Sequence, residues 1–356
     1  MSTVSSANQS ASQLPVIDIQ SLLAEKEGQD AVVDSIKKAC ESTGFFYIKT
    51  GVSPSLIARL ELGAHRFFSK SVEEKEKIAM VKSGKAWRGF FKVGDELTSG
   101  RKDMKEGIYF GREESDCDGM TPLRGRNLFP EEADGTVLLK DEVLEYMNTM
   151  KRCGNALMRA ISKSLPGATL EKHFVTDPTE LFRIFSYPVP MSSEEQGNEI
   201  YGVGEHTDYG FLTILYQDPT GGLQVKVPSS TGEFVWQDVP YIEGTHVVNL
   251  GDALEHYTHG QFVATPHRVI YHGRPVSVEG KPRLSFPYFF DPCWTAPMTP
   301  MSIVGTATRG NNRWDGADPK QFEGTYGDYL QRKISRVFPQ LFSEVVMCKE
   351  TKVSKA

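Results

Sequence analysis

Residues of the types that bind metal ions stand close together in the second half of the chain. His206, Thr207 and Asp208 form an H-x-D triplet inside a short run bounded by glycines. In an extended segment residues i and i+2 point to the same face, so this imidazole and carboxylate could converge on one cation. A second histidine from another strand would complete a two-histidine, one-carboxylate set. Such a set leaves three adjacent coordination positions open, as non-haem Fe(II) oxygen chemistry requires.

The triplet itself leaves the third metal ligand open. The histidines that follow it in the sequence are His246, His256, His259, His267 and His272. Of these, His246, His267 and His272 stand in strand-like segments, so spacing alone does not choose among them. An H-x-D triplet is also common where a surface or core histidine stands beside a turn aspartate. The metal interpretation therefore depends on other motifs.

A second pair of polar residues, Arg283 and Ser285, is also separated by one residue. If this segment is a strand, both side chains share a face that points into the protein. A guanidinium beside a hydroxyl is a good receptor for a carboxylate, because arginine binds that group through two parallel hydrogen bonds. A buried arginine is costly unless it is paired, whereas an arginine at a strand edge in solvent would have no such role.

The elements that must position these residues are mainly strands. After Phe182 short runs of β-branched and aromatic residues alternate with Gly, Pro, Asp and Asn turns. Regular short strands of this kind are typical of a sandwich or jelly roll. The predicted strands are 211–217, 223–227, 246–250, 262–263, 267–272 and 283–290, with turns at 219–222, 229–232, 251–252 and 259–260.

The first half of the chain is mainly helical. Ser53 followed by Pro54 has the form of an N-cap and a first helical residue, and Ser71 to Glu74 has the form of a capping box. Together the two halves predict an α+β protein, with a double-stranded β-helix (jelly-roll) core and flanking N-terminal and C-terminal helices. The predicted helices are 29–42, 54–68, a short one from 71, 141–165 and 322–342, and the predicted early strands are 14–19 and 44–48.

Composition excludes several other classes of protein. The 356-residue chain is 39% hydrophobic and 24% charged, which is ordinary for a globular protein with a large core. Its formal net charge is -6, so we expect no nucleic-acid partner. Apolar runs are too short to span a membrane. Five cysteines without a C-x-x-C pair, and an N-terminus without a signal-like segment, predict a cytoplasmic protein.

The domain organisation predicted from the sequence is simple. There is no internal repeat and no Ser/Gly/Pro-rich linker long enough to separate domains. We expect a disordered tail over 1–13, one domain over 14–342 and a polar tail over 343–356. Within the domain we expect a mixed N-terminal region to about 180, a jelly-roll core over about 181–295 and a C-terminal helix over about 320–342. We also expect the protein to be a monomer.

The ordered set of motifs resembles the isopenicillin N synthase-like family of 2-oxoglutarate/Fe(II)-dependent dioxygenases. The resemblance covers nearly the whole chain, from about Leu14 to Leu341. The matching segments are 14–18, 44–47, 67–68 with 73–75, 94–96, 103–106, 128–130, 206–210, 221–225, 249–252 and 266–269. Each motif is weak by itself, but their order is specific to the family.

The resemblance assigns roles to residues that spacing left open. The family's metal motif, H-x-D with a distant histidine, matches His206, Asp208 and His267, which would be the iron ligands and catalytic centre. Its R-x-S motif matches Arg283 and Ser285 as the anchor of the 2-oxoglutarate cosubstrate. Its R-x-x-x-Y-P segment matches residues 183–188, which implies that Tyr187 also contacts the cosubstrate.

The activity implied by the resemblance is oxidation of a small molecule by dioxygen. An Fe(II)- and 2-oxoglutarate-dependent dioxygenase would hydroxylate or oxidatively demethylate its substrate and release succinate and CO2, with ascorbate as a further reductant. The alternatives are an Fe(II) oxidase of the same fold that does not use 2-oxoglutarate, and a non-catalytic ligand-binding jelly roll. The substrate itself is not predicted. Candidate substrate contacts are Phe91, Tyr209, Phe211, Phe286 and Asp291, together with the segments 87–91 and 108–110.

Overall fold

Two β-sheets form the centre of the molecule. The computed structural model describes residues 13–25, 28–98, 100–114, 122–167, 170–174, 177–188, 200–229, 231–271, 281–301 and 322–343. The larger sheet has the strand order β1-β2-β12-β9-β14-β7-β6-β3 and the smaller has the order β11-β10-β13-β8. β4 pairs only with β5 among the described strands. Strands drawn from both halves of the chain therefore build one large sheet.

The strands are short, as the turn spacing predicts. Their bounds are β1 (Val16–Asp18), β2 (Phe45–Lys49), β3 (Gly89–Phe91), β4 (Leu97–Thr98), β5 (Arg101–Lys102), β6 (Glu106–Gly111), β7 (Pro178–Tyr187), β8 (Ile200–His206), β9 (Leu212–Gln217), β10 (Leu223–Pro228), β11 (Phe234–Asp238), β12 (His246–Leu250), β13 (His267–Tyr271) and β14 (Arg283–Cys293). β1 pairs with β2 in parallel, whereas the pairs that build the rest of the two sheets are antiparallel.

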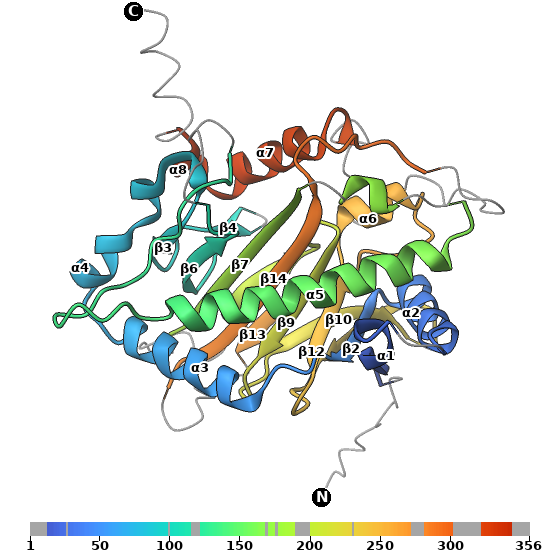
Figure 1. Cartoon of the computed structure of the whole chain (residues 1–356), viewed down its shortest axis with the longest axis horizontal. Coiled ribbons are helices and arrows are strands. Elements are labelled where there is room, and N and C mark those ends of the chain that lie inside the picture. The colour runs from blue at the N-terminus through green and yellow to red at the C-terminus, as the bar shows by residue number, and fades with distance from the viewer. Residues whose placement is uncertain are drawn as a thin grey trace, which may run out of the picture.

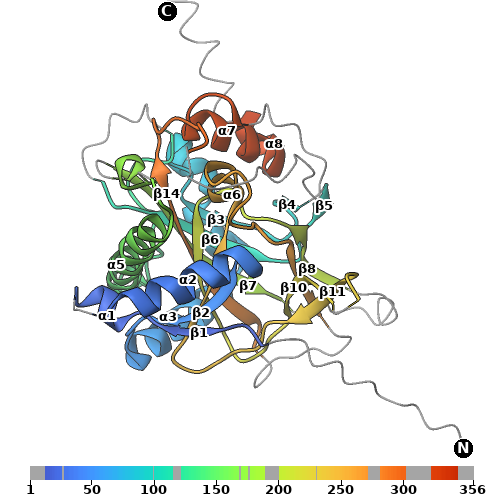
Figure 2. The same ribbon diagram turned by 90° about the vertical axis from the view of Figure 1, so that its right-hand side faces the viewer.

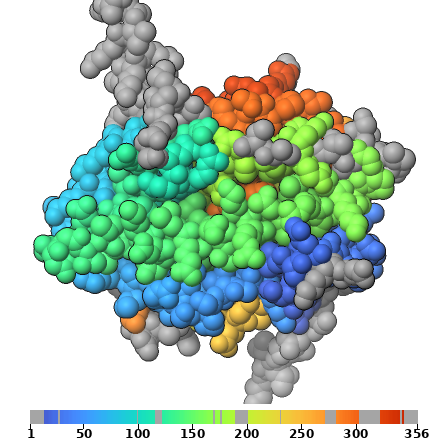
Figure 3. Space-filling view, in the orientation of Figure 1, coloured from blue at the N-terminus to red at the C-terminus, as the bar shows by residue number. Residues whose placement is uncertain are grey.

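The helices are α1 (Gln20–Leu23), α2 (Asp30–Ser42), α3 (Pro54–Phe68), α4 (Val72–Lys75), α5 (Lys140–Ser164), α6 (Asp252–Tyr257), α7 (Tyr326–Val337) and α8 (Pro339–Phe342). Of these, α1, α2, α3 and α5 pack together as a layer on one side of the large sheet, and α7 lies across the top of the molecule in Figure 1. Short 3₁₀ segments lie at Glu76–Ile78, Met80–Ala86 and Leu170–His173. The long α5 crosses the front of the large sheet (Figure 1), and the small sheet lies on the opposite side (Figure 2). In the space-filling view α5 and α3 cover this front face (Figure 3).

Both predicted helix starts are confirmed. The Ser53 side chain accepts a hydrogen bond from the backbone N–H of Leu56 at 3.2 Å, with Pro54 as the first helical residue. Ser71 and Glu74 form the reciprocal capping box that the sequence predicts. These local signals are reliable because they satisfy orphan backbone N–H groups within a few residues.

The structure corrects three predicted elements. The single helix predicted over 322–342 begins only at Tyr326 and is interrupted at Phe338, because Pro339 disfavours helical geometry in the residue before it. The strand predicted at 262–263 is wrong. The Val263 N–H instead bonds the carbonyl of Cys40 at the end of α2. The turn predicted at 251–252 is the start of α6, which is too short to show a helical period.

Helix α5 packs closely against the large sheet at Gly154. A Cβ atom there would lie 2.6 Å from Cγ of Phe290 in β14, so only glycine allows this approach. Phe290 is fully buried and stacks on Phe174 with ring centroids 5.3 Å apart. This packing fixes β14, which carries Arg283 and Ser285, against the helical layer. Among the described residues no helix is both long enough and apolar enough to cross a bilayer.

Candidate metal and cosubstrate site

The metal-binding residues predicted from the sequence meet at one end of the small sheet. His206 is the last residue of β8 and His267 is the first of β13, and the two face each other across the antiparallel ladder. Asp208 follows β8 by two residues. Its Oδ1 lies 3.7 Å from Nε2 of each histidine. The three ligand atoms lie within 4.8 Å of one another. The strand register therefore selects His267 as the third member, which spacing alone could not do.

Hydrogen bonds behind these residues point their ligand atoms inward. Nδ1 of His206 lies 2.8 Å from the Gly204 carbonyl, and Nδ1 of His267 lies 3.1 Å from the Thr265 carbonyl. A carbonyl accepts only, so each Nδ1 carries the proton and each Nε2 lone pair is free for a metal.

The carboxylate of Asp208 is held in the same manner. Its Oδ2 accepts hydrogen bonds from Thr213 Oγ1 at 2.5 Å and Asn249 Nδ2 at 2.6 Å. This leaves Oδ1, the oxygen that faces both histidines, available as a ligand. Because Thr213 lies on β9 and Asn249 on β12, the large sheet fixes the carboxylate while the small sheet supplies the imidazoles. Partners of this kind orient metal ligands in most protein sites.

The electrostatics of the three residues suit a divalent cation. Burial raises the pKa of the Asp208 carboxyl, but His267, His206 and the two hydrogen bonds together hold it below its ordinary value. Burial lowers the pKa of His267 to about 4. At neutral pH the aspartate is therefore charged and this imidazole neutral, which are the forms that bind metals. Two imidazoles and one carboxylate are a ligand set that Fe(II) accepts, so the residues fit the predicted iron.

The other candidate histidines have different surroundings. His256 stacks on Phe322 with centroids 4.1 Å apart, and His259 occupies a left-handed turn after α6. His272 lies outside the described residues. His246 is buried in β12, where its Nδ1 lies 3.1 Å from Oγ1 of Thr50. The structure therefore places none of the described alternatives beside Asp208.

The buried His246 makes stability depend on pH. Burial lowers its pKa to about 3, whereas an unfolded histidine titrates near pH 6.5. Between these values the unfolded chain binds the extra proton, so stability is lost as the pH falls through this window. We expect this residue alone to reduce the unfolding free energy by about 1 kcal/mol between about pH 7.5 and 5.5. Urea unfolding at both pH values should show a smaller loss in His246→Gln. An equal loss in both proteins would contradict this prediction.

The predicted cosubstrate anchor is a buried polar cluster. Arg283 is only 3% exposed. Its Nε donates to the Gly221 carbonyl at 2.7 Å and its Nη2 lies 3.4 Å from Gln217 Oε1. Its Nη1 is buried and has no hydrogen-bond partner among the described residues.

Two hydroxyl groups stand beside this free guanidinium edge. The hydroxyls of Ser285 and Tyr187 lie 3.3 Å apart, and the Arg283 guanidinium stands 4.6 Å from the Tyr187 ring centroid. Tyr187 is paired with Arg283 in the register of β7 and β14. A carboxylate here would accept from the free N–H and from both hydroxyls, which is the receptor that the motif predicts.

One cavity joins the anchor to the metal-binding residues. It is lined by alternate residues of β7 and of β14, because successive side chains of a strand point to opposite faces. On β7 these are Leu181, Arg183, Phe185 and Tyr187, and on β14 they are Arg283, Ser285, Pro287, Phe289 and Asp291. The cosubstrate anchor lies at one end of both rows, and the other end is left for a substrate.

The predicted substrate contacts divide into two groups. Tyr209 and Asp291 line the cavity. Phe91, Phe211 and Phe286 do not line it. Phe91 packs behind the wall against Phe185, Phe211 packs in the core on Phe174, and Phe286 packs in the core on Tyr216. For Phe286 the reason is strand alternation, since its neighbours Ser285 and Pro287 take the cavity face.

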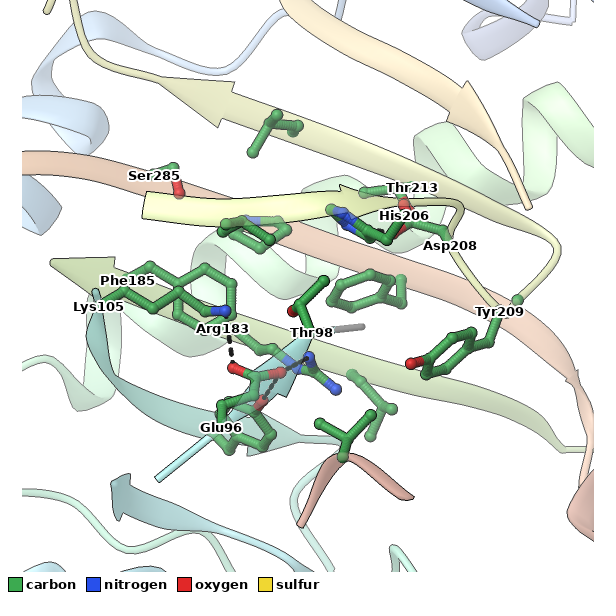
Figure 4. A pocket seen from close by; sticks show the side chains of 18 of the residues that line it. Glu96, Thr98, Lys105, Arg183, Phe185, His206, Asp208, Tyr209, Thr213 and Ser285 are labelled. Carbon is green, nitrogen blue, oxygen red and sulfur yellow. Dashed lines mark hydrogen bonds and ion pairs between the residues drawn. The ribbon is translucent and has the colours of Figure 1, made fainter. Parts of the chain in front are cut away.

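Three charged residues at the substrate end, Glu96, Lys105 and Arg183, were not predicted as substrate contacts. Figure 4 shows Glu96 facing Lys105 and Arg183 across the cavity from His206 and Asp208. Glu96 Oε2 lies 2.9 Å from Lys105 Nζ, and Glu96 Oε1 accepts a hydrogen bond from the Tyr109 hydroxyl at 3.1 Å. The signal in the sequence was Arg183 itself, a charge between apolar neighbours in β7. Such a residue must face either solvent or a cavity.

Comparisons with known proteins agree with this geometry. The family described as non-haem dioxygenase in morphine synthesis, N-terminal, matches residues 14–132, and the 2OG-Fe(II) oxygenase superfamily matches residues 178–292. A Dictyostelium discoideum protein named as an iron/ascorbate oxidoreductase is 42% identical, over 94% of this chain and 97% of that protein. The chain belongs to the 2OG-Fe(II) oxygenase superfamily. It is therefore an oxidoreductase, a dioxygenase that depends on Fe(II) and 2-oxoglutarate.

Other known proteins are similar to this chain along most of their length. The 1-aminocyclopropane-1-carboxylate oxidase of Dictyostelium mucoroides is 35% identical, over 92% of this chain and 95% of its own. A full-length Neurospora crassa protein, solved in complex with alpha-KG, has a TM-score of 0.71 and 28% identity, over 90% of this chain and 96% of that chain. The predicted α+β fold with a jelly-roll core and the predicted family are both confirmed.

Proposed function

We propose that His206, Asp208 and His267 hold the iron, and that Arg283, Ser285 and Tyr187 hold the far carboxylate of 2-oxoglutarate. The observation that carries this proposal is the arrangement of polar atoms in one cavity. Two Nε2 atoms and one carboxylate oxygen converge on one point, and the buried Arg283 Nη1 has no partner among the described residues. A charged donor in that position is costly until an anion accepts from it.

Neighbouring residues of the chain hold the three metal-binding side chains in position. Thr213 and Asn249 keep one Asp208 oxygen turned toward the two histidines, and the Gly204 and Thr265 carbonyls keep the imidazoles in one tautomer. When bound, the iron supplies dioxygen activation coupled to decarboxylation of 2-oxoglutarate to succinate and CO2. Walls that include Leu223 and Val269 exclude water between the anchor and the metal-binding residues.

We further propose that the substrate is a small organic molecule that is hydroxylated or oxidatively demethylated. It would occupy the end of the cavity lined by Tyr209, Phe289 and Asp291. We also propose that residues 14–342 form one domain, that the protein is a cytoplasmic monomer, and that ascorbate serves as a reductant. The name of the Dictyostelium discoideum relative supports the choice of ascorbate.

The proposal is tested by measuring the products of the cosubstrate. Purified enzyme with Fe(II), ascorbate and 2-oxoglutarate should release succinate, and a substrate should raise that rate in proportion to its own oxidation. The second candidate function is an Fe(II) oxidase that needs no 2-oxoglutarate. The similarity to a 1-aminocyclopropane-1-carboxylate oxidase favours testing it. Substrate-dependent oxygen uptake without any 2-oxoacid would support the oxidase and overturn the 2-oxoglutarate role of Arg283.

A further inference from the structure

The substrate end of the cavity presents hydrogen-bond donors that have no acceptors. Nε1 of Trp87, Nε and Nη1 of Arg88, and Nε of Arg183 are buried atoms without a hydrogen-bond partner among the described residues. All three side chains line the cavity that contains the metal-binding residues. Buried polar atoms in proteins are nearly always paired, so four unpaired donors on one wall indicate a missing acceptor.

The lack of a side chain at Gly111 leaves space for the guanidinium of Arg88. Arg88 is 1% exposed, and its Nη2 donates to the Leu123 carbonyl at 2.6 Å. Its guanidinium fills the space above Gly111, where a Cβ atom would lie 2.0 Å from Nη2. Gly111 and Tyr109 are two residues apart on β6 and share a face. Arg88 stands over the first, and the Arg183 guanidinium stands 4.0 Å from the ring centroid of the second. Along the strand these two points are about 7 Å apart.

Aromatic rings contact the faces of the Arg183 guanidinium, whereas its Nε has no hydrogen-bond partner among the described residues. Its guanidinium lies between the rings of Tyr109 and Phe289, 4.0 Å and 4.7 Å from their centroids. Such stacking fixes the plane but uses none of the N–H donors. The Glu96 carboxylate approaches Nη1 only to 3.8 Å, which is beyond hydrogen-bond distance. Glu96 bonds Lys105 and Tyr109 instead (Figure 4).

The carboxylates on the cavity wall do not neutralise both arginines. Lys105 forms ion pairs with both Glu96 and Asp103, so those two charges are shared with a third cation. Burial raises the pKa of Asp291 to about 7, which leaves this carboxyl partly protonated at neutral pH. Arg88, Arg183 and Lys105 thus lie near three carboxyl groups. Lys105 already pairs with two of them, Glu96 and Asp103, and the third, Asp291, is partly protonated.

Carboxylates near Arg88 are also engaged elsewhere. Glu113 and Glu114 favour the charged form of Arg88, but burial outweighs them and lowers its pKa to about 10. The guanidinium therefore remains charged at neutral pH. Glu114 accepts hydrogen bonds from both Arg112 and Arg124, and neither glutamate lines the cavity. Among the described residues no carboxylate hydrogen-bonds Arg88, so its Nε and Nη1 donors stay unpaired.

We propose that the substrate of this enzyme is an organic acid whose carboxylate binds Arg88 and Arg183, with the oxidised carbon between them and the iron ligands. This assignment rests on the proposed function, because it places the substrate in the same cavity as 2-oxoglutarate. A carboxylate would accept from the unpaired donors of both arginines. A cationic substrate is disfavoured, since it would offer no acceptor to these donors.

The proposal is tested with acids and their neutral primary amides. The probes are phenylacetate with phenylacetamide and hexanoate with hexanamide, titrated by calorimetry into the anaerobic enzyme saturated with Fe(II) and 2-oxoglutarate. Saturation keeps the acids away from Arg283. We expect at least one acid to bind, at least about tenfold more tightly than its amide, since hydrogen bonds between charged partners are the stronger ones. If neither acid binds, or if the amides bind as tightly, the acid site is refuted.

Variants test which residues cause the preference for the acid over its amide, and whether the 2-oxoglutarate site is independent of them. Arg183→Gln and Arg88→Gln should each remove most of the preference for the acid, and Arg183→Lys should restore part of it. The matched control Arg59→Gln changes an exposed arginine on α3 and should leave the preference intact. Affinity for 2-oxoglutarate, measured in separate titrations of the anaerobic Fe(II)-loaded enzyme, should stay unchanged in all four variants and report their folding. Loss of 2-oxoglutarate binding in the wild type would instead contradict the proposed function.

Discussion

Replacing Asp208 by alanine is expected to abolish succinate formation and Fe(II) binding together. Asp208 is the only anionic member of the ligand set, and its Oδ1 lies at the same distance, 3.7 Å, from both histidine Nε2 atoms. Losing a residue that merely orients a ligand costs about 10- to 100-fold in metal affinity. Losing the ligand itself should cost at least about 10³-fold, which is about 4 kcal/mol or more. Anaerobic Fe(II) titration and a succinate assay measure the two losses.

A matched control distinguishes metal loss from unfolding. Asp34→Ala removes an exposed aspartate in the middle of α2 and should leave both iron affinity and turnover unchanged. The Asp208→Ala protein should remain folded, because the strands around it are held by their own ladders. A folded Asp208→Ala enzyme that still binds one Fe(II) per chain with wild-type affinity would show that the iron lies elsewhere.

The second large effect is expected at Arg283. Arg283→Gln removes the only charged donor of the cosubstrate anchor and leaves the far carboxylate of 2-oxoglutarate unpaired in a buried site. Truncating one partner of a buried charge pair costs about 2–5 kcal/mol, so the apparent affinity for 2-oxoglutarate should fall about 10²- to 10³-fold. The dependence of succinate formation on 2-oxoglutarate concentration measures the shift.

Two further observations make this result specific. Fe(II) affinity should not change in Arg283→Gln, because Arg283 makes no contact with the three metal-binding residues. Arg283→Lys should recover part of the loss, since lysine keeps the charge but lacks the two-pronged donor geometry. An unchanged 2-oxoglutarate dependence in Arg283→Gln would exclude the proposed anchor and favour the oxidase alternative.

Local signals in the sequence were sufficient for most elements that carry the site. Ser53 with Pro54 and the Ser71 capping box act within single turns, so these helix starts could be predicted without any tertiary information. Strand alternation correctly placed Arg283 and Ser285 on one face of β14. The third metal ligand could not be predicted from local signals. His267 lies beside His206 through the register of β13 with β8, a long-range pairing that no local pattern encodes. Only the ordered family motifs selected it.

The substrate end could be predicted only in part. The candidate segments 87–91 and 108–110 do contribute lining residues, but their arrangement depends on long-range pairing. Arg88 directly precedes β3, whereas Tyr109 lies on β6 and Arg183 on β7, so the three meet only when these strands pair. The space for Arg88 depends on the absence of a side chain at Gly111, which reads in the sequence as an ordinary glycine. Phe286, which was predicted to contact the substrate, instead fills the core because it occupies the opposite face of β14.

The location of the iron tests the central claim most directly. Crystals grown without oxygen in the presence of Fe(II) and 2-oxoglutarate should be measured at the iron absorption edge. We predict one anomalous peak per chain, bound by Nε2 of His206, Nε2 of His267 and Oδ1 of Asp208, with 2-oxoglutarate extending from it to Arg283. A peak bound by other residues, or 2-oxoglutarate directed away from Arg283, would contradict this account.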